Sequence, residues 1–254
     1  MTENKVRSIL WSAPRCTSTA FEYAIRRGGG VAVVHEAYTD AAYFGAERWL
    51  PRYLHLPAHP GLRYDDVRRR LEYDFDKTGV FVKDMAYALG SNFDALPRNF
   101  AHAMLIRDPR RAIPSMYKIA ISGDAPEWAD FLPIETGFDA LCSLYEHLCS
   151  QNLEPLVIDS ADLLSKPKTV LQAFCEHSGI EYSHTMISWP EEKHIKEWES
   201  WGPVWYHTLL SARGFSDRGP TSLPSLANLP LPIRSAITAA MPYYKRLYSR
   251  KLII

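Results

Sequence analysis

Five short segments rich in apolar and β-branched residues alternate with stretches of helical character, and this alternation limits the fold more than any other feature of the sequence. The segments are residues 6–11, 31–34, 79–84, 101–107 and 155–159. Continuous apolar runs of this length predict strands that are buried on both sides. The sequence therefore predicts an α/β fold, with a parallel sheet flanked by helices on both faces.

The carboxyl ends of the predicted strands carry the first candidate site residues. Ligands of an open parallel sheet bind in the crevice outside these ends. The residues found at or directly after them are Trp11, Glu36, Lys83, Arg107 and Asp159. We therefore expect the functional site at this edge of the sheet.

The chain length favours one large domain. With 254 residues, of which 46% are hydrophobic, residues 1–254 can bury a single core. Residues 38–76 are rich in Tyr, Arg, His and Pro and have weak periodicity, which predicts short helices forming a lid or acceptor-site insertion rather than core. Residues 190–254 are expected to form a C-terminal cap that ends in a helix over 233–249.

The charge balance and the cysteines exclude several classes of protein. Lys and Arg number 29 and Asp and Glu number 29, so no protein-wide field attracts nucleic acid or an anionic membrane, and any anion must be held by a local cluster. No segment is apolar over the length that a membrane span needs. We therefore expect a cytoplasmic protein that has no transmembrane segment. The four cysteines show no CxxC spacing, which predicts ordinary thiols and no metal site.

The segment after the first predicted strand has the pattern of an anion-binding loop. It reads Ser12-Ala13-Pro14-Arg15-Cys16-Thr17-Ser18-Thr19 and leads into a predicted helix that ends at Gly28 to Gly30. Backbone N–H groups at such a helix start converge on an anion, and Arg15 adds a guanidinium suited to phosphate or sulfate. The G-x-x-x-x-G-K-[ST] pattern of nucleotide triphosphatases and kinases is missing.

Three motifs resemble those of the sulfotransferase family. Pro14 to Thr19 looks like its P-R-S-x-S-T loop, and Arg107-Asp108-Pro109 with Ser115 is similar to its strand-end R-[DN]-P and the serine eight residues after the arginine. The stretch over 155–180 resembles a late strand, D-L-l-x-x-P turn and helix of the same family. The resemblance implies a P-loop nucleoside-triphosphate-hydrolase-like fold of the sulfotransferase type.

The same resemblance implies a reaction and its binding residues. The expected donor is 3′-phosphoadenosine 5′-phosphosulfate (PAPS), whose sulfuryl group moves to a hydroxyl or amine of a small-molecule acceptor without a required metal. Arg107 and Ser115 are expected to bind the 3′-phosphate, and Arg213 with Gly214 to close over it. Arg15 and the loop residues Cys16, Thr17, Ser18 and Thr19 are expected at the transferred group, where Lys83 supplies a second cation.

At the position of the general base, the sequence differs from that of one branch of the family. Where cytosolic sulfotransferases have Lys-x-His, this chain has Lys83-Asp84-Met85, and Met85 cannot accept a proton. Glu36 is the first candidate, since it resembles the glutamate proposed as base in bacterial and carbohydrate branches. His35 is the second candidate, and Cys16 is read as a small filler.

Aromatic residues leave the acceptor site open between two readings. Tyr38, Tyr43, Phe44, Trp49 and Tyr53 suggest a ring-bearing or apolar acceptor in secondary metabolism, or else packing within the lid. The cluster Trp198, Trp201 and Trp205 predicts a packed helical face or an acceptor wall. Alternatives for the whole chain are a P-loop kinase-like phosphotransferase and a non-catalytic nucleotide-binding protein. The oligomeric state stays open, a homodimer included, as does a carrier-bound acceptor.

Overall fold

A parallel five-stranded sheet forms the centre of the molecule. The computed structural model describes residues 5–190, 195–215, 223 and 225–254. The strands run in the order β2-β3-β1-β4-β5, and every neighbouring pair is parallel. Their bounds, which confirm the predicted segments to within one or two residues, are β1 Arg7–Ser12, β2 Ala32–His35, β3 Val80–Met85, β4 Ala101–Ile106 and β5 Leu156–Asp159.

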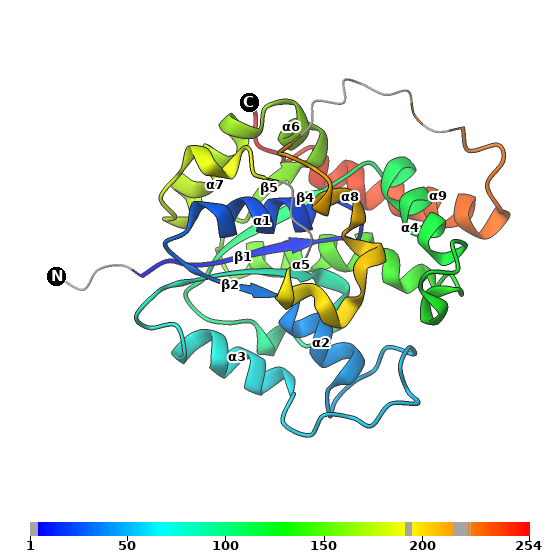
Figure 1. The fold of residues 1–254 in the computed structure, drawn as a ribbon, viewed down its shortest axis with the longest axis horizontal. Coiled ribbons are helices and arrows are strands. Elements are labelled where there is room, and N and C mark those ends of the chain that lie inside the picture. The colour runs from blue at the N-terminus through cyan, green and yellow to red at the C-terminus, as the bar shows by residue number, and fades with distance from the viewer. Residues whose placement is uncertain (1–4, 191–194, 216–222, 224) are drawn as a thin grey trace.

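Helices connect and cover these strands (Figure 1). The α-helices of the described residues are α1 Ser18–Gly28, α2 Ala37–Phe44, α3 Tyr64–Tyr73, α4 Pro109–Ala120, α5 Phe138–Ser150, α6 Ser160–Ser165, α7 Pro167–Ser178, α8 His207–Leu210 and α9 Leu231–Tyr248. Short 3₁₀ turns are η1 Ala86–Leu89, η2 Phe93–Ala95, η3 Pro126–Trp128, η4 Pro133–Thr136, η5 His184–Met186, η6 Lys196–Trp201 and η7 Pro203–Trp205. None of the described helices is both long and apolar enough to cross a bilayer.

Both faces of the sheet are covered, as predicted. On one face Phe81 of β3 packs against Phe21 of α1 and Phe174 of α7, with ring centroids 6.4 and 5.8 Å away. On the other side α9 contacts β4 and β5 and packs on α4 and α5 (Figure 1). The interior strands β1 and β3 are almost wholly buried, which explains why their sequences are continuously apolar.

The prediction that residues 38–76 lie outside the core is wrong for α2. Tyr38 and Tyr43 are fully buried, and their hydroxyls are satisfied by Ala95 O at 2.6 Å and by a carboxylate oxygen of Glu135 at 2.8 Å. A tyrosine is stable in a core when its hydroxyl finds such a partner. The segment 51–63 is largely exposed, so only this later part has the character of an insertion.

Asp84 at the end of β3 fixes the start of α2. Its buried carboxylate accepts hydrogen bonds from the backbone N–H groups of Tyr38 and Thr39, at 2.7 and 3.1 Å, and from the Thr39 hydroxyl at 2.6 Å. It also accepts from the N–H of Met85 at 2.8 Å. The first N–H groups of a helix have no partner within it, and Asp84 of β3 supplies the acceptor for two of those of α2. It therefore caps α2 from a neighbouring strand.

Replacing Asp84 with alanine should therefore destabilise the protein. The change leaves buried N–H and O–H donors of α2 and β3 without an acceptor, and we expect a loss of about 1–3 kcal/mol in the free energy of unfolding. Urea denaturation followed by circular dichroism measures it. The exposed Asp124→Ala is the matched control, and equal stability of the two variants would contradict the capping role.

Candidate functional site

The loop between β1 and α1 has the backbone of an anion cradle. Arg15 and Thr17 adopt left-handed conformations, with φ of 64° and 72°, on either side of Cys16. The N–H groups at the start of α1 have no partners within the helix and point out of its N-terminus. The Thr17 hydroxyl caps no helix N–H, contrary to the simple capping role of such a residue, and instead lies 2.6 Å from the Ser160 hydroxyl.

Cys16 has the filler role that the sequence predicts. Its side chain is fully buried and its thiol donates to the carbonyl of Pro14 at 3.7 Å. Burial, together with the charge of Asp159 and against the attraction of Arg107, raises the pKa of the thiol to about 12. A neutral, enclosed thiol is a poor nucleophile, so Cys16 contributes only backbone to the loop.

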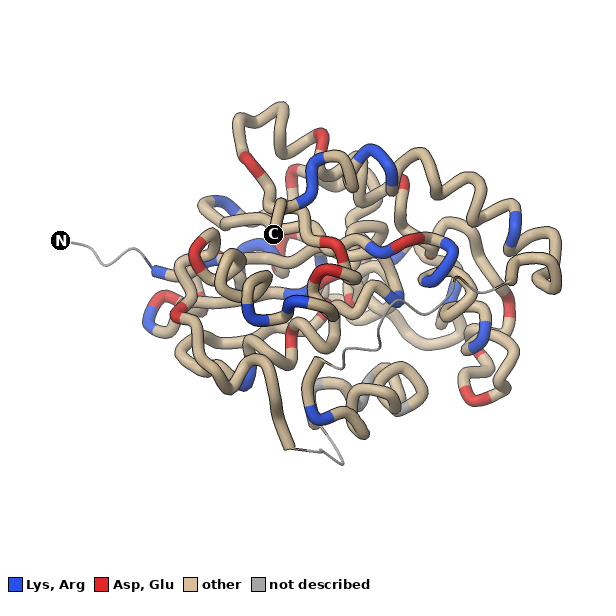
Figure 2. The backbone as a smooth tube through the Cα atoms, turned by 90° about the horizontal axis from the view of Figure 1, so that it is seen from above, with Lys and Arg blue, Asp and Glu red and all other residues tan. Residues whose placement is uncertain are grey.

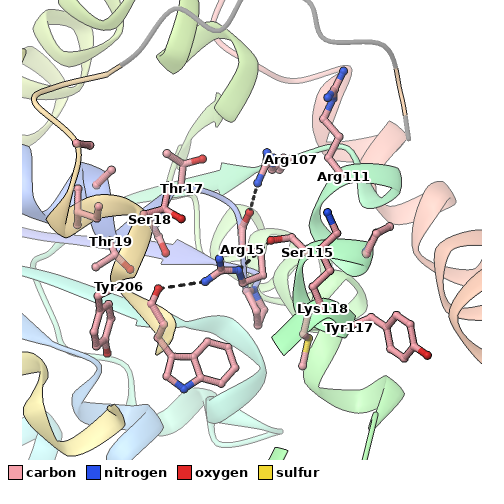
Figure 3. Close-up of a pocket in the computed structure, with 18 of the residues that line it drawn as sticks. Arg15, Thr17, Ser18, Thr19, Arg107, Arg111, Ser115, Tyr117, Lys118 and Tyr206 are labelled. Atoms are coloured by element: carbon pink, nitrogen blue, oxygen red, sulfur yellow. Dashed lines mark hydrogen bonds between the residues drawn. The ribbon is translucent and has the colours of Figure 1, made fainter. Parts of the chain in front are cut away.

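The structure brings together Arg15, Arg107 and Ser115 (Figure 3). Arg15 Nε donates to Ser115 Oγ at 3.1 Å, and Arg107 Nη1 donates to the Arg15 carbonyl oxygen at 2.7 Å. Arg15 Nη1 also donates to the carbonyl of Trp205 at 3.2 Å. Two motifs that lie about a hundred residues apart in the chain, the loop at Arg15 and the Arg107–Ser115 motif, thus meet at the ends of β1 and β4.

Positive charge at this point is not balanced by carboxylates. Burial first, and then the charge of Arg107, lowers the pKa of Arg15, and burial likewise lowers the pKa of Arg107, with Arg111 adding to the effect. Within the described part of the chain neither Arg15 nor Arg107 forms an ion pair with Asp or Glu. Two partly desolvated guanidinium groups that repel each other favour the binding of an anion.

These residues line a cavity of about 1220 Å³. Its basic lining residues are Arg15, Arg107, Arg111, Lys118 and Arg213, whereas Glu36 is its one acidic residue among those described. Basic and acidic positions are otherwise interspersed along the described backbone (Figure 2), and the formal net charge of the whole chain is +0. The positive cavity is therefore a local feature, as the composition requires.

Arg111 and Lys118 were not identified from the sequence. With Ser115 they stand at positions i, i+4 and i+7 of α4, which is the spacing of one helix face. Figure 3 shows these side chains on the wall beside Arg15 and Arg107. The helical spacing from Ser115 was the signal that could have found them.

Arg213 and Gly214 also line the cavity, as the sequence predicts for a closing loop. Gly214 has φ of 142° and pairs with Ser188 in an isolated antiparallel bridge. A Cβ at this position would lie 2.7 Å from the carbonyl oxygen of Ile187. Only glycine allows this close backbone approach.

Glu36 faces the cavity from the end of β2. It has a left-handed φ of 48°, and its N–H donates to the Lys83 carbonyl at 2.8 Å, which extends the β2–β3 pairing by one residue. Its carboxylate forms an ion pair with Lys83 Nζ. Lys83 itself is fully buried and is not among the described lining residues, so this cation supports Glu36 from below instead of standing free at the cavity.

His35 lies behind Glu36, and the described lining of the cavity does not include it. Its ring nitrogens lie 2.5 Å from a carboxylate oxygen of Glu22 and 3.1 Å from the Tyr206 hydroxyl. Its Nε2 atom is 3.6 Å from Glu36 Oε1. Of the two candidate bases, Glu36 is the one with direct access to a ligand.

An apolar wall stands beside Glu36. It is built by Met85, Tyr87, Trp128, Trp201, Trp205 and Tyr206. The described lining does not include the aromatic residues singled out in the sequence, Tyr38, Tyr43, Phe44, Trp49 and Tyr53. Of the two readings given for them, the structure favours packing over contact with an acceptor. Trp201 and Trp205 line the cavity, which agrees with the second of the two interpretations of the tryptophan cluster, a wall of the site.

The family of the chain follows from comparison with known proteins. The sulfotransferase domain family matches residues 6–251, and the chain belongs to this family. A curated relative, branched-chain-amino-acid aminotransferase-like protein 1 of Arabidopsis thaliana, is 28% identical over 94% of this chain. The match spans only 41% of that relative's own length.

Solved sulfotransferase structures share the fold. The sulfotransferase domain of the Synechococcus PCC 7002 olefin synthase gives a TM-score of 0.54 at 14% identity, covering 92% of this chain and 93% of its own. A sulfotransferase from Alicyclobacillus acidocaldarius gives 0.52 at 13% identity, covering 97% of both chains. The predicted fold class is thereby confirmed. Among the described residues no group of three or more His, Cys, Asp or Glu side chains is arranged to hold a metal ion.

Asp40, one helical turn after Glu36, gives the site a pH-dependent effect on stability. Burial, and then the charges of Glu36 and Asp84, raises the pKa of Asp40 from 3.8 to about 7. The folded protein thus keeps this proton at pH values where the unfolded chain has lost it, so the free energy of unfolding falls as the pH rises through this range.

Replacing Asp40 with asparagine should remove that contribution. Between about pH 4 and about pH 7, the variant should lose less stability than the wild type, because its side chain has no proton to release. Urea denaturation at several pH values measures this difference, with Asp66→Asn on α3 as the control. Parallel stability curves for wild type and Asp40→Asn would refute the raised pKa.

Proposed function

We propose that this domain is a sulfotransferase that uses PAPS and transfers its sulfuryl group to the hydroxyl, or amine, of a small-molecule acceptor. The observation that carries the proposal is the meeting of Arg15, Arg107 and Ser115 with Glu36 in one cavity. An anion site and an accessible carboxylate are the two components that transfer of a sulfuryl group to a hydroxyl requires.

The residues present fit a donor with two anionic ends. The N–H groups around Cys16 to Thr19, together with Arg15, suit the phosphosulfate end, where oxygen atoms carry the charge. Arg107, Ser115 and Lys118 suit the 3′-phosphate, and Arg213 with Gly214 suit the closing loop. Apolar residues of the same cavity, Leu164, Phe215 and Leu229, offer contacts for the adenine ring.

The proposed reaction assigns each side chain one task. PAPS supplies the activated sulfuryl group. Glu36 takes the proton from the acceptor hydroxyl as its oxygen forms a bond to sulfur. Arg15 and the loop N–H groups stabilise the negative charge that grows on the leaving bridge oxygen as its bond to sulfur breaks. Lys83 pairs with the Glu36 carboxylate and orients it, which replaces the direct role at the sulfuryl group expected of Lys83 from the sequence.

The wall beside Glu36 favours an uncharged, apolar or ring-bearing part of the acceptor. Trp128, Trp201 and Tyr206 bring large flat surfaces, and no described acidic residue besides Glu36 lines the cavity. We keep a hydroxyl-bearing molecule of secondary metabolism, free or attached to a carrier, as the acceptor class.

Ligand selectivity separates this function from its alternatives. A thermal-shift comparison of PAPS, adenosine 3′,5′-bisphosphate, ATP and GTP should show stabilisation by the first two, since only they carry a 3′-phosphate. Preference for ATP, with magnesium required for turnover, would instead support a kinase-like phosphotransferase. If PAPS binds but is not cleaved with any acceptor tested, the result would support a non-catalytic nucleotide-binding protein.

Arg107→Ala should weaken binding of adenosine 3′,5′-bisphosphate by ~1.5–3 kcal/mol, the contribution of a hydrogen bond to a charged group. Isothermal titration calorimetry measures the change. Arg110→Ala is the matched control, because Arg110 follows closely in the first turn of α4 but pairs with Asp108 and does not appear in the described lining of the cavity. Equal affinity of the two variants would contradict the 3′-phosphate assignment.

Glu36→Gln should lower kcat by about 10²- to 10⁴-fold while leaving donor affinity almost unchanged, since an amide keeps the shape but cannot accept the proton. The rate is followed as release of adenosine 3′,5′-bisphosphate from PAPS, and the affinity by calorimetry. Normal turnover in this variant would exclude Glu36 as the base.

A further inference from the structure

Glu22 is a buried carboxylate of α1 that the mechanism above does not use. Its side chain is fully buried, and one oxygen accepts hydrogen bonds from Trp198 Nε1 at 3.0 Å and from Arg26 Nη2 at 3.3 Å. The other oxygen lies 2.5 Å from Nδ1 of His35. A carboxylate with three donors in the interior is held in one orientation and one charge state.

The charge of Glu22 fixes the proton on His35. Burial alone would raise the pKa of Glu22, but its contacts with His35 and Trp198 and the charge of Lys83 outweigh it and lower this pKa to about 2. Trp198 and Arg26 both donate to Glu22, so its carboxylate acts as an acceptor. Because the contact with Nδ1 needs a proton and Glu22 has none to give, Nδ1 of His35 carries it.

The second ring nitrogen of His35 is then free to accept. Nε2 lies 3.1 Å from the Tyr206 hydroxyl and 3.6 Å from Glu36 Oε1. In the neutral ring its lone pair accepts the hydrogen bond of Tyr206, so a continuous chain of donors and acceptors runs from Tyr206 through His35 to Glu22. The same lone pair stands beside the proposed base.

We propose that Glu22 is a positioning residue that makes His35 the second proton acceptor of the site, so that the proton taken up by Glu36 passes on to Nε2 of His35. This inference rests on the proposed sulfotransferase function and joins the two candidate bases into one path. Glu36 contacts the acceptor, and His35 stores the proton away from the cavity.

The proton balance of this path is complete. The acceptor O–H bond breaks as an O–H bond forms on Glu36, and that bond breaks in turn as an N–H bond forms at Nε2 of His35. The Tyr206 hydroxyl gives up its hydrogen bond to Nε2 and turns toward the cavity that Tyr206 lines. Glu22 stabilises the resulting imidazolium, and the ionised Glu36 is restored.

Several other charges bear on His35 and set the pH response. The charged and titratable groups around it are Glu22 and Arg26 of α1, Lys83 of β3, Glu36 and Asp40 at α2, and Tyr206 after η7. Among these, Glu22 alone makes a direct contact with Nδ1. Loss of its charge therefore weakens the hold of His35 on a second proton.

The test measures Glu22→Gln in PAPS hydrolysis, with water as the acceptor and enzyme in excess. We expect the rate to fall about 10- to 100-fold, less than the full contribution of a general base, with the affinity for adenosine 3′,5′-bisphosphate unchanged. The acidic limb of the pH–rate profile should move to lower pH. Glu22→Asp should restore part of the rate, and the exposed Glu154→Gln should match the wild type.

The outcomes separate this inference from the proposed function. If Glu36→Gln is inactive but Glu22→Gln keeps the rate and pH profile of the wild type, the base stands and the path through His35 is refuted. If the wild type neither binds adenosine 3′,5′-bisphosphate nor cleaves PAPS, the proposed function fails and the inference fails with it.

A second measurement does not depend on the variant folding. Nitrogen NMR of the wild type at mildly alkaline pH should show a neutral His35 ring protonated at Nδ1, assigned by the loss of its signals in His35→Gln. A ring protonated at Nε2 would overturn the proposal, because that nitrogen could not then accept a proton from Glu36.

Discussion

The cavity of this sulfotransferase domain has basic side chains at one end and the Glu36 carboxylate at the other, and the rest of the site depends on this separation of charge. Arg107 donates a hydrogen bond to the carbonyl oxygen of Arg15. Among the described groups, no carboxylate forms an ion pair with either side chain. Burial lowers the pKa of both guanidinium groups, and the charge of Arg107 adds to the effect on Arg15 while that of Arg111 adds to the effect on Arg107. The chain has zero formal net charge, so the basic lining of this cavity is a local concentration of positive charge among the described residues.

At the opposite end of the cavity the carboxylate of Glu36, and that of Glu22 behind it, have partners within the protein. Lys83 pairs with Glu36, and His35 lies against Glu22, with Lys83, Glu22 and His35 all buried. Removing one member of such a pair leaves an uncompensated buried charge, which is far more costly than the pair itself. The base end is therefore complete before any ligand arrives, whereas the anion end is completed by the ligand. The strand order β2-β3-β1-β4 joins these two ends within one cavity.

The sequence predicts the parts of this arrangement that depend on local pattern. Apolar runs located the strands, and the loop and strand-end motifs identified Arg15, Arg107 and Ser115. Contacts made by distant segments could not be predicted, since Tyr206 meets His35 across 171 residues and no pattern encodes that approach. The core position of α2 was not predicted for a similar reason, because the side chain that caps this helix, Asp84, lies on β3, more than 40 residues later in the chain. Lys83 was expected at the ligand because it stands at the carboxyl end of a neighbouring strand, but it is fully buried and Glu36 lines the cavity in its place.

Strained backbone links the fold to the site. Arg15, Thr17 and Glu36 are non-glycine residues with left-handed φ of 64°, 72° and 48°, and each such conformation costs about 1–3 kcal/mol unless its surroundings impose it. Those surroundings are long-range here. Arg107 binds the Arg15 carbonyl, Ser160 holds the Thr17 side chain, and Lys83 anchors Glu36 through both its carbonyl and its ammonium group. Each partner stands on or directly after another strand of the sheet. The anion loop and the base are therefore properties of the assembled sheet, and the motif residues acquire their geometry only when β3, β4 and β5 are in place beside β1 and β2.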